Sequence, residues 1–498
     1  MEIETRAHVD DTLLIPRRAQ RHEGPPWYAR AVVVIGAVTA LAAGLRFYHL
    51  SQPRDYIFDE VYYAKDGCFD AGIPFRQCDL DNPGEQTVTV HPPVGRELIA
   101  AGIGVYGNRP FGWRVTAAVF GTLSVLLVSL LALRLFGSVL WGAVAGLLLA
   151  TESLNFVQSR TSMLDIFVAT FVLAGFLFLV LDRQWMERRT PETEVLSPSD
   201  AADAALFDLP ADRPPSPIFR PWRLTAGIAF GAAVATKWSG GAALAGALVL
   251  ALAWERTRRK RSGLGRPLWE AFRSEAFGIF LFLILVPIMV YVASYARWFT
   301  LNGFDLQGLW RLQGSMASFS LQLSAEHPYA SRPWTWILMA RPVAYYYKAG
   351  TPAGTAAEVL GMGSPAIFWG SLLAIPFAFL WWIRRRDWRA GLIVVGFAVQ
   401  YFPWFATGRT SFLFYMTPIT PFLVLAVVYA LERLADVRVG LSRARVLAPL
   451  VVVAVLLAVG VFGFFFPVLT GRTISSEAWQ ARMWFGCAAE TTCLFNWV

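Results

Sequence analysis

Long apolar stretches constrain this chain more than any other feature. Windows of about 17 to 25 apolar residues recur along its whole length, and each could cross a bilayer as a helix. The 498-residue chain is 56% hydrophobic and only 16% charged, with a mean hydropathy of +0.46. That is far too apolar for a soluble protein of this size. We therefore expect an all-α polytopic membrane protein.

About eleven transmembrane helices are expected. Their approximate ranges are 31–50, 113–135, 139–156, 164–181, 223–239, 241–254, 276–296, 366–383, 390–405, 411–431 and 446–467. Clusters of Arg and Lys, such as those at 256–261 and 384–386, fall in alternate loops, and such clusters mark the cytoplasmic side. The pattern predicts a plasma-membrane protein with its N-terminus in the cytoplasm and its C-terminus outside. It also explains the net charge of +9 without nucleic acid binding.

The spans divide the chain into a few regions. These are a cytoplasmic tail (1–30), the transmembrane domain (31–467), two long external loops within it (51–111 and 297–365), a cytoplasmic loop (182–222) and an external tail (468–498). The cytoplasmic loop is rich in Pro, Asp and Ser with mixed charge, so we expect it to be flexible. Each external loop is expected to carry a helix lying on the membrane, at residues 94–106 and 306–323.

Four cysteines lie outside the apolar stretches. Cys68 and Cys78 share the first external loop, and Cys487 and Cys493 share the external tail. If both regions face outside, each pair could form a local disulfide bond. Their spacing does not suggest a zinc site, because no second Cys or His pair stands at the required distance. No metal is expected.

Two adjacent carboxylates, Asp59 and Glu60, stand just after the first span. Apolar and aromatic residues surround them in the sequence, so a carboxylate there should lose hydration and its pKa should rise. Such a group is poised to take a proton. The alternative interpretation is an ordinary solvated pair of loop charges.

Further polar residues are expected at the external ends of the spans, beside these carboxylates. They are His91, Arg96, Arg114, Glu152, Arg160, Asp165 and Lys237. Each has a simpler alternative, since His91 could be a hydrogen-bonded loop residue, Arg114 and Lys237 could extend to the interface, and Arg160 and Asp165 could form a structural ion pair. Together, several cations at the depth of the lipid headgroups suit a lipid phosphate.

The second external loop adds aromatic residues and further donors. Among them are His327, Tyr329, Trp334 and Arg341. Aromatic rings can stack on sugars, and Arg and His can donate to hydroxyls or phosphate. A packed aromatic lid without a binding role is the alternative.

Five motifs in this order resemble those of the protein O-mannosyltransferases, and more narrowly of their bacterial, actinobacterial-type members. They are Asp59-Glu60, His91-Pro-Pro-Val-Gly-Arg, Ser159-Arg-Thr-Ser-Met-Leu-Asp165, Thr236-Lys-Trp-Ser-Gly, and His327-Pro-Tyr-Ala-Ser-Arg-Pro-Trp-Thr-Trp followed by Arg341-Pro. The resemblance covers about residues 31–467. It departs from the family at Arg96, where the family often has Lys. The loop 297–365 is also too short for the sugar-binding-like domain of eukaryotic members.

The resemblance implies a GT-C type glycosyltransferase fold and a donor, polyprenyl-phosphate mannose, with no required cofactor. The acceptor would be a Ser or Thr hydroxyl of an exported protein, and the anomeric centre would be inverted. The residues fit this division of labour, because an inverting transfer needs one base and the phosphate leaving group needs cations. We expect Asp59 to be the base and Glu60 to orient the acceptor or tune Asp59. The expected phosphate clamp is Arg114, Arg160 and Lys237, helped by His91 and Arg96; His327, Tyr329, Trp334 and Arg341 would shape the acceptor side.

Two other functions fit parts of the pattern. A related transferase could deliver the sugar to a glycan or lipid acceptor, although the run from His327 to Arg341 favours protein acceptors. A flippase or transporter for lipid-linked sugars would need charges and broken helices near the bilayer midplane, whereas most charges here fall at one rim. Expected partners are the lipid-linked donor, Ser/Thr-containing exported polypeptides and membrane lipids. The protein translocation machinery is a further candidate.

Overall fold

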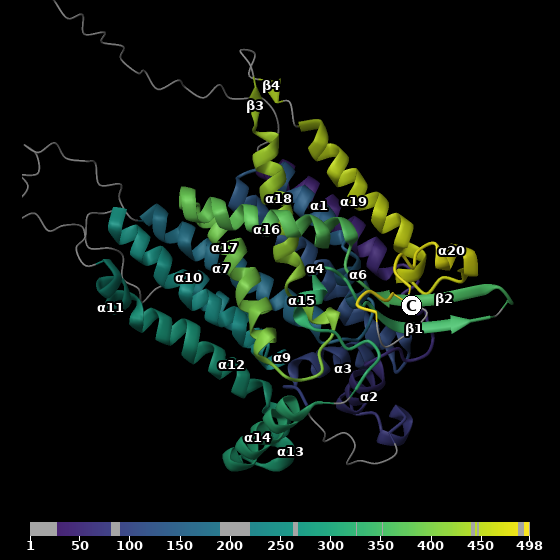
Figure 1. The fold of residues 1–498 in the computed structure, drawn as a ribbon. Helices are drawn as coiled ribbons and strands as arrows, with labels where there is room; N and C mark the ends of the chain where they lie inside the picture. Colours follow the sequence, from purple (N-terminus) through teal and green to yellow (C-terminus); the bar gives the residue numbers. More distant parts are fainter. Residues whose placement is uncertain are drawn as a thin grey trace, which may run out of the picture.

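Helices form most of this computed structural model, which describes residues 27–80, 90–189, 220–261, 267–324, 326–350, 352–439, 444–445, 448–486 and 493–497. The main bundle helices are α1 (Trp27–Phe47), α4 (Pro110–Phe136), α5 (Val139–Ala150), α7 (Asp165–Arg189), α9 (Pro221–Thr236), α10 (Gly240–Arg261), α11 (Pro267–Ile279), α12 (Val286–Ser294), α16 (Pro365–Arg385), α17 (Trp388–Tyr401), α18 (Thr420–Ala435) and α19 (Ala448–Leu469). Helix occupies every stretch that the sequence predicts as a span (Figure 1). Among the described residues, seven helices are long and apolar enough to cross a membrane, so the number eleven stays a prediction.

Several predicted spans are interrupted helices. The third consists of α5 and the short α6 (Ser153–Gln158), and the tenth begins with a 3-10 turn, η5 (Leu413–Met416), before α18. The seventh joins α11 to α12 through η3 (Phe280–Leu285), a π-helical turn. Pro287 follows η3 and lacks the N–H that would bond one turn back, which explains the widened turn. This interruption carries no charged residue, unlike the broken helices of transporters.

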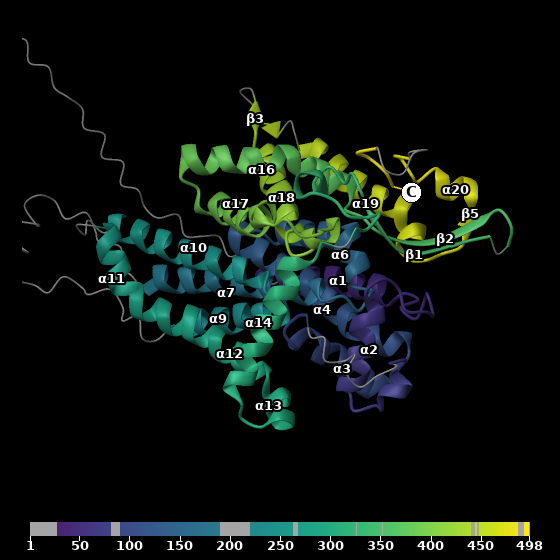
Figure 2. The same cartoon turned by 60° about the horizontal axis from the view of Figure 1, so that its bottom comes forward.

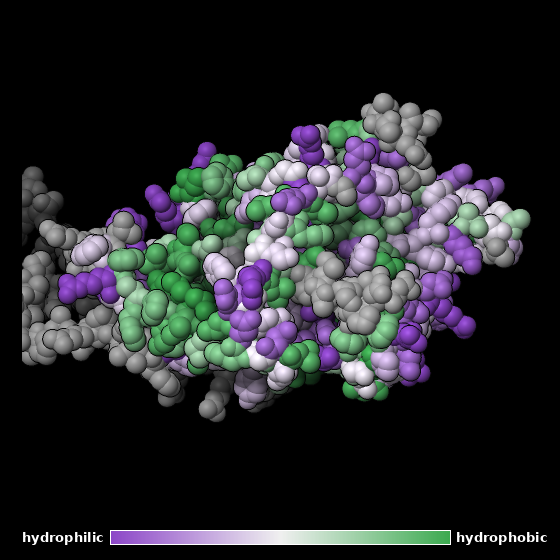
Figure 3. Space-filling view, turned by 90° about the horizontal axis from the view of Figure 1, so that it is seen from below, coloured by the Kyte–Doolittle hydropathy of each residue, from purple (hydrophilic) through white to green (hydrophobic). Residues whose placement is uncertain are grey.

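The bundle has central and peripheral helices. In α7, 78% of the most apolar window is buried, compared with 17% in α1 and 28% in α19. The peripheral helices turn large apolar side chains outward, such as Val32 and Leu456. Figure 3 shows a broad hydrophobic surface on one face, with hydrophilic residues toward both ends. An apolar outer surface around a packed interior is what a lipid environment requires.

Two layers cap one end of the bundle (Figure 2). In the first, α2 (Glu60–Asp70), η1 (Phe75–Cys78) and α3 (Val94–Tyr106) pack together. The disulfide bond Cys68–Cys78 ties η1 to α2 as predicted, whereas Cys487 of the second predicted pair lies outside the described residues. The predicted helix at 94–106 is confirmed as α3, with Pro93 at its N-cap.

The second layer adds a small sheet to the mostly helical fold. Strands β1 (Val343–Ala349) and β2 (Thr355–Gly361) form an antiparallel hairpin, and β5 (Ile474–Ser475) extends it in the order β1-β2-β5. The tail also carries α20 (Ser476–Gln480), and a separate two-stranded ribbon pairs β3 (Arg438–Val439) with β4 (Ala444–Arg445). Trp497 of the tail is buried and its Nε1 donates to the Met339 carbonyl at 2.7 Å. The described part of the tail is therefore packed onto the loop 297–365.

The loop 297–365 also carries three helices. It contains α13 (Ala296–Asn302), α14 (Leu306–Gln322) and α15 (Pro333–Trp336). The helix predicted at 306–323 is thus confirmed as α14. Its large apolar residues Leu306, Trp310 and Leu321 are strongly exposed, which fits a helix that meets another phase.

A buried charge network holds the other end of the bundle. Arg220 and Arg223, at the start of α9, both pair with Asp182 of α7 and with Glu275 of α11. Two cations and two carboxylates balance in charge, and each guanidinium contacts both acids. The network therefore joins three helices at the end opposite α2 and the β-sheet.

Glycines set the closest helix contact. The glycines Gly227 and Gly231 of α9 lie against the helix that contains η3 and α12. A Cβ on Gly227 would stand 1.9 Å from the Phe282 carbonyl oxygen, so the two backbones touch there. Gly241 of α10 has no atom within 4 Å of the same position.

These two glycines make a matched pair for a stability test. We expect Gly227→Ala to lower the free energy of unfolding by about 1–3 kcal/mol, because the added methyl has no space. Gly241→Ala should be neutral or stabilising by up to about 1 kcal/mol, since Ala is the better helix former. Thermal unfolding of both variants in detergent measures the difference. Equal midpoints would contradict the close contact of α9 and α12.

Candidate active site

The two adjacent carboxylates, Asp59 and Glu60, have different surroundings in the structure. Asp59 occupies the N-cap position of α2, and Glu60 is its first residue. Glu60 is fully buried and accepts hydrogen bonds from the backbone N–H groups of Ile57 (3.1 Å) and Ser162 (3.0 Å). Arg114 adds a two-point contact, with Nε at 2.8 Å and Nη2 at 2.7 Å from its two oxygens. Glu60 is therefore occupied by the protein, and it cannot orient an acceptor as we expected.

The Arg114 side chain is likewise bound within the protein. Its other donors reach the carbonyl oxygens of Leu50 (3.3 Å), Pro53 (2.6 Å) and Asp55 (3.1 Å), and its side chain is fully enclosed. The predicted role of Arg114 in a phosphate clamp is wrong for this arrangement, because no donor faces a cavity. The residue instead holds the segment between α1 and α2 in place.

Arg160 also serves the fold. Its guanidinium donates to the carbonyl oxygens of Leu45, Arg46, Tyr48 and His49, at 2.5–3.3 Å, at and just beyond the end of α1. Those carbonyls have no partner within the helix, and a cation there also suits the helix dipole. The expected phosphate role of Arg160 is therefore corrected to a cap. The alternative pairing of Arg160 with Asp165 is not formed either, since Asp165 binds Lys237.

Asp59 differs from Glu60 in its hydrogen bonding. Its side chain accepts no hydrogen bond from any residue that the structure describes, and it does not cap α2. Burial raises the pKa of Asp59 to about 6, the positive charge of Lys237 lowers it, and the negative charge of Asp165 raises it. The carboxylate is thus close to both partners of an ion pair and is left free to bind a proton.

Lys237 and Asp165 form the cationic side of this site. The Lys237 Nζ lies 2.9 and 3.1 Å from the two Asp165 oxygens, and 4.7 Å from the centre of the Tyr415 ring. Lys237 follows the last residue of α9 and Asp165 begins α7, so two helix ends position the pair. Lys237 is buried, as expected for a cation that turns away from the lipid.

His91 belongs to the same cluster. Burial lowers its pKa well below the usual value, and the positive charges of Lys237, Arg409 and Arg96 lower it further. The imidazole is therefore neutral, so it can donate one hydrogen bond and accept another. The prediction that His91 stands near Lys237 agrees with this arrangement.

Arg409 is a site residue that the sequence reasoning missed. It is half-buried, its Nη2 donates to the Tyr415 hydroxyl at 3.3 Å, and its Nε is buried without a partner among the described residues. No carboxylate within the described ranges pairs with it, so it contributes a full positive charge. The signal was present, because Arg409 is a lone cation beside an apolar stretch, as Lys237 is.

Aromatic rings line the side of the site next to Asp59. Phe58 stacks on Tyr345 of β1 with centroids 4.8 Å apart, and meets His327 edge-on at 6.3 Å. His327 also packs against Phe412 at 5.1 Å, and its Nδ1 accepts from the Tyr329 backbone N–H. The second long loop therefore closes over the residue preceding Asp59, as the sequence predicts for His327 and Tyr329.

The remaining predicted residues lie apart from Asp59 or are bound within the fold. Arg96 pairs with Asp66 and Asp70 of α2 at 3.6 and 3.8 Å. Glu152 caps α6 and accepts from the Ser364 N–H at 2.9 Å, so its side chain is bound within the fold.

Trp334 and Arg341 also fall outside the cluster. Trp334 is 48% exposed on α15. Arg341 donates to the carbonyls of Pro328 and Cys493, so it joins the loop 297–365 to the tail and is not presented to an acceptor.

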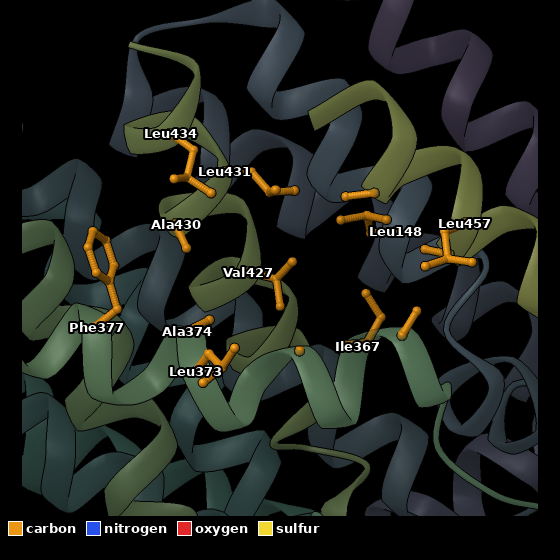
Figure 4. Close-up of a pocket in the computed structure, with 14 residues that line it drawn as sticks. Leu148, Ile367, Leu373, Ala374, Phe377, Val427, Ala430, Leu431, Leu434 and Leu457 are labelled. Atoms are coloured by element: carbon orange, nitrogen blue, oxygen red, sulfur yellow. The ribbon is translucent and has the colours of Figure 1, made fainter. Parts of the chain in front are cut away.

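A separate apolar pocket lies between α5, α16, α18 and α19 (Figure 4). Its volume is about 450 Å³, and every lining side chain that Figure 4 draws is hydrocarbon. Its lining residues include Ile367, near the start of α16, and Leu434, near the end of α18. The pocket therefore runs along much of the length of these helices. It can hold an acyl or prenyl chain, but it offers no group for catalysis.

No cluster of three or more His, Cys, Asp or Glu side chains suited to a metal occurs among the residues that the structure describes. The groups that the described site offers for chemistry include the Asp59 carboxyl group, the Lys237–Asp165 ion pair, the neutral imidazole of His91 and the Arg409 guanidinium.

Known structures share this architecture. The Saccharomyces cerevisiae protein O-mannosyltransferase Pmt1-Pmt2 complex bound to the sugar donor superimposes with a TM-score of 0.72 at 13% identity, over 94% of each chain. ArnT from Cupriavidus metallidurans in the apo state gives a TM-score of 0.52 at 15% identity, over 90% of this chain and 77% of that one. The fold is thus that of a membrane glycosyltransferase of the GT-C class.

Sequence comparison identifies the family within that class. Residues 90–189 match the family described as dolichyl-phosphate-mannose-protein mannosyltransferase, and residues 305–487 match the C-terminal four-TMM region of protein O-mannosyltransferase. Polyprenol-phosphate-mannose–protein mannosyltransferases are 34% identical in Mycobacterium tuberculosis and 33% in Mycolicibacterium smegmatis, over 92–93% of each chain. The chain belongs to this family of protein mannosyltransferases.

The contrast between Glu60 and Asp59 is testable by stability. Glu60→Ala should lower the free energy of unfolding by about 3–5 kcal/mol, because it leaves the Arg114 guanidinium buried without its counter-ion. Asp59→Ala should be neutral or slightly stabilising at pH 7, since the buried, ionised Asp59 itself costs stability. Thermal unfolding in detergent compares the two. If Asp59→Ala were the more damaging, the assignment of Glu60 as the structural acid would fail.

Proposed function

We propose that this protein transfers mannose from polyprenol-phosphate mannose to Ser or Thr hydroxyls of exported proteins, with inversion, at the outer face of the membrane. Asp59 is the general base. The observation that carries the proposal is the state of Asp59: a largely enclosed carboxylate with a pKa of about 6 and no hydrogen-bond donor among the residues that the structure describes. The names of the relatives supply the donor and the sugar.

The chemistry requires such a base. A Ser or Thr hydroxyl is a poor nucleophile until its proton is removed as it attacks C1 of the sugar. A carboxylate with a pKa near the working pH is both ionised and basic enough to take that proton. Glu60 lies next in the sequence but cannot act, because Arg114, Ile57 and Ser162 already occupy its oxygens.

The departing polyprenyl phosphate needs positive charge and no proton. Lys237 and Arg409 can supply it, and His91, held neutral, can donate one hydrogen bond. Asp165 compensates the charge of Lys237, so Arg409 provides the uncompensated positive charge. Fixed cations in a partly enclosed site stabilise a developing phosphate charge better than water does, because they need no reorganisation.

The outer-face assignment follows from charge distribution. Asp59 lies with α2, α3 and the β-sheet at one end of the bundle (Figure 2). The basic stretches 256–261 and 384–386 end α10 and α16 at the other. Since such stretches stay in the cytoplasm, Asp59 faces outward, where exported polypeptides pass.

Asp59→Asn tests the base. We expect transfer of labelled mannose to a Ser/Thr peptide to fall at least about 100-fold, the size typical of losing a general base. Binding of the lipid donor should change less than about threefold. Asp55→Asn is the matched control, because Asp55 is an exposed carboxylate of the same segment. Transfer by Asp59→Asn at near wild-type rate would remove Asp59 as the base.

The acceptor is tested in the same membranes. A Ser/Thr peptide should accept mannose, whereas glycan and lipid acceptors should not. Transfer to a lipid or glycan without transfer to the peptide would reassign the acceptor and leave the role of Asp59 intact.

The pH dependence follows from the same carboxylate. Because the pKa of Asp59 is raised to about 6, the base is protonated below that pH and ionised above it. We expect kcat/KM for the peptide to rise about tenfold for each pH unit below 6 and to level off above 7. Initial rates in buffers of constant ionic strength measure the profile. A rate that is flat between pH 5 and 7 would contradict a base with this pKa.

A further inference from the structure

In addition to the apolar pocket between α5, α16, α18 and α19, a polar pocket lies at the end of the bundle opposite Asp59. Trp254, Trp382 and Trp388 form its walls, and Arg256, Lys260 and Arg386 stand around it. We call it the basic tryptophan pocket. Its volume is about 480 Å³. Lys260 lies about 30 Å along α10 from Gly240 at 1.5 Å per residue, so this pocket is separate from the catalytic site.

The pocket is uniformly positive. Its lining contains four cations, including Arg183, and no Asp or Glu. Arg256, Lys260 and Arg386 are exposed, and none has a carboxylate partner among the described residues. The nearby Glu255 is already paired with Arg258 and Arg259. Three uncompensated cations around one hollow attract an anion.

The tryptophans add directed donors. Arg183 lies over the rings of Trp254 (5.1 Å) and Trp388 (4.4 Å), which fixes both indoles, and Gly391 packs against Trp382. The indole N–H groups of Trp254, Trp382 and Trp388 donate to no residue within the described part of the chain. Indoles at a membrane interface place such a group against lipid headgroups.

The surroundings distinguish a lipid from a free anion. Val249 of α10, with Leu380 and Ile383 of α16, turns strongly exposed aliphatic side chains outward near the pocket. A ligand with a phosphate among the cations can therefore lay its chains on these helices. Free phosphate would contact the cations but not the aliphatic side chains.

We propose that the basic tryptophan pocket binds the phosphate headgroup of an anionic phospholipid, with Arg256, Lys260 and Arg386 as its counter-ions. The proposal is independent of the transfer reaction, because none of these residues contacts the Asp59 cluster. It agrees with general experience that basic pockets between helices on the cytoplasmic side recognise acidic lipids.

Native mass spectrometry of the purified full chain in detergent tests this. The probes are phosphatidylglycerol and phosphatidylcholine with identical acyl chains. We expect phosphatidylglycerol to be retained about tenfold more strongly, and the variant Lys260→Gln/Arg386→Gln to lose that preference. Arg384→Gln/Arg385→Gln is the matched control, since it removes two cations of the same α16 end that do not line the pocket.

Each result decides the proposal. Equal retention of the two lipids by the wild type, or equal losses in both double variants, would overturn it. Displacement of phosphatidylglycerol by millimolar inorganic phosphate would show a simple anion site and overturn the lipid assignment. If the pocket variant unfolds, Lys260→Gln alone, at a fully exposed side chain, should still lower the preference several-fold. Peptide mannosylation in detergent should remain unchanged in every variant.

Discussion

The buried pairing of Glu60 with Arg114 is the interaction on which the end of the molecule that carries Asp59 depends. Both oxygens of Glu60 are bound by one guanidinium, whose remaining donors hold the chain that leaves α1. Two charges removed from water are tolerated here because every donor and acceptor is matched. The pair fixes the start of α2, and the start of α2 fixes where Asp59 lies. Glu60 therefore stabilises the fold, while the neighbouring carboxylate, Asp59, keeps no hydrogen-bond partner among the described residues.

Sequence reasoning located this end of the protein well, because its arguments rest on hydrophobicity. Apolar stretches reveal the helices, and a charge beside such a stretch is costly enough to need a reason. Asp59, Lys237 and His91 follow from that rule, and Arg409 would have done so had it been applied throughout. The disulfide bond Cys68–Cys78 followed from the position of both cysteines in one predicted external loop.

The rest depended on side-chain direction, which one sequence does not contain. Arg114 and Arg160 are cations beside apolar stretches just as Lys237 is, yet both point into the protein and bind carbonyl oxygens. The β1–β2 hairpin was hidden for another reason. Its strands are short, and the third strand, β5, comes from the tail more than a hundred residues later. Long-range pairing of this kind leaves little local signal.

The two ends of the bundle differ in how their charged side chains are arranged. At the Asp59 end, cations and an aromatic wall surround an acid, which suits transfer of a sugar from a lipid phosphate to a hydroxyl. At the other end, Arg220 and Arg223 are neutralised by acids, while Arg256, Lys260 and Arg386 are not. The bundle between them is apolar on its outside, so the two charged ends are separated by about the thickness of a bilayer.

The most direct test is a structure of the protein with a polyprenol-phosphate sugar analogue and a Ser/Thr peptide bound together. The distance from the Asp59 carboxylate to the acceptor hydroxyl is the quantity to measure. The account predicts hydrogen-bond reach, about 2.6–3.2 Å, with Glu60 still held by Arg114. A hydroxyl remote from Asp59, or one bound by Glu60 after its release from Arg114, would contradict it.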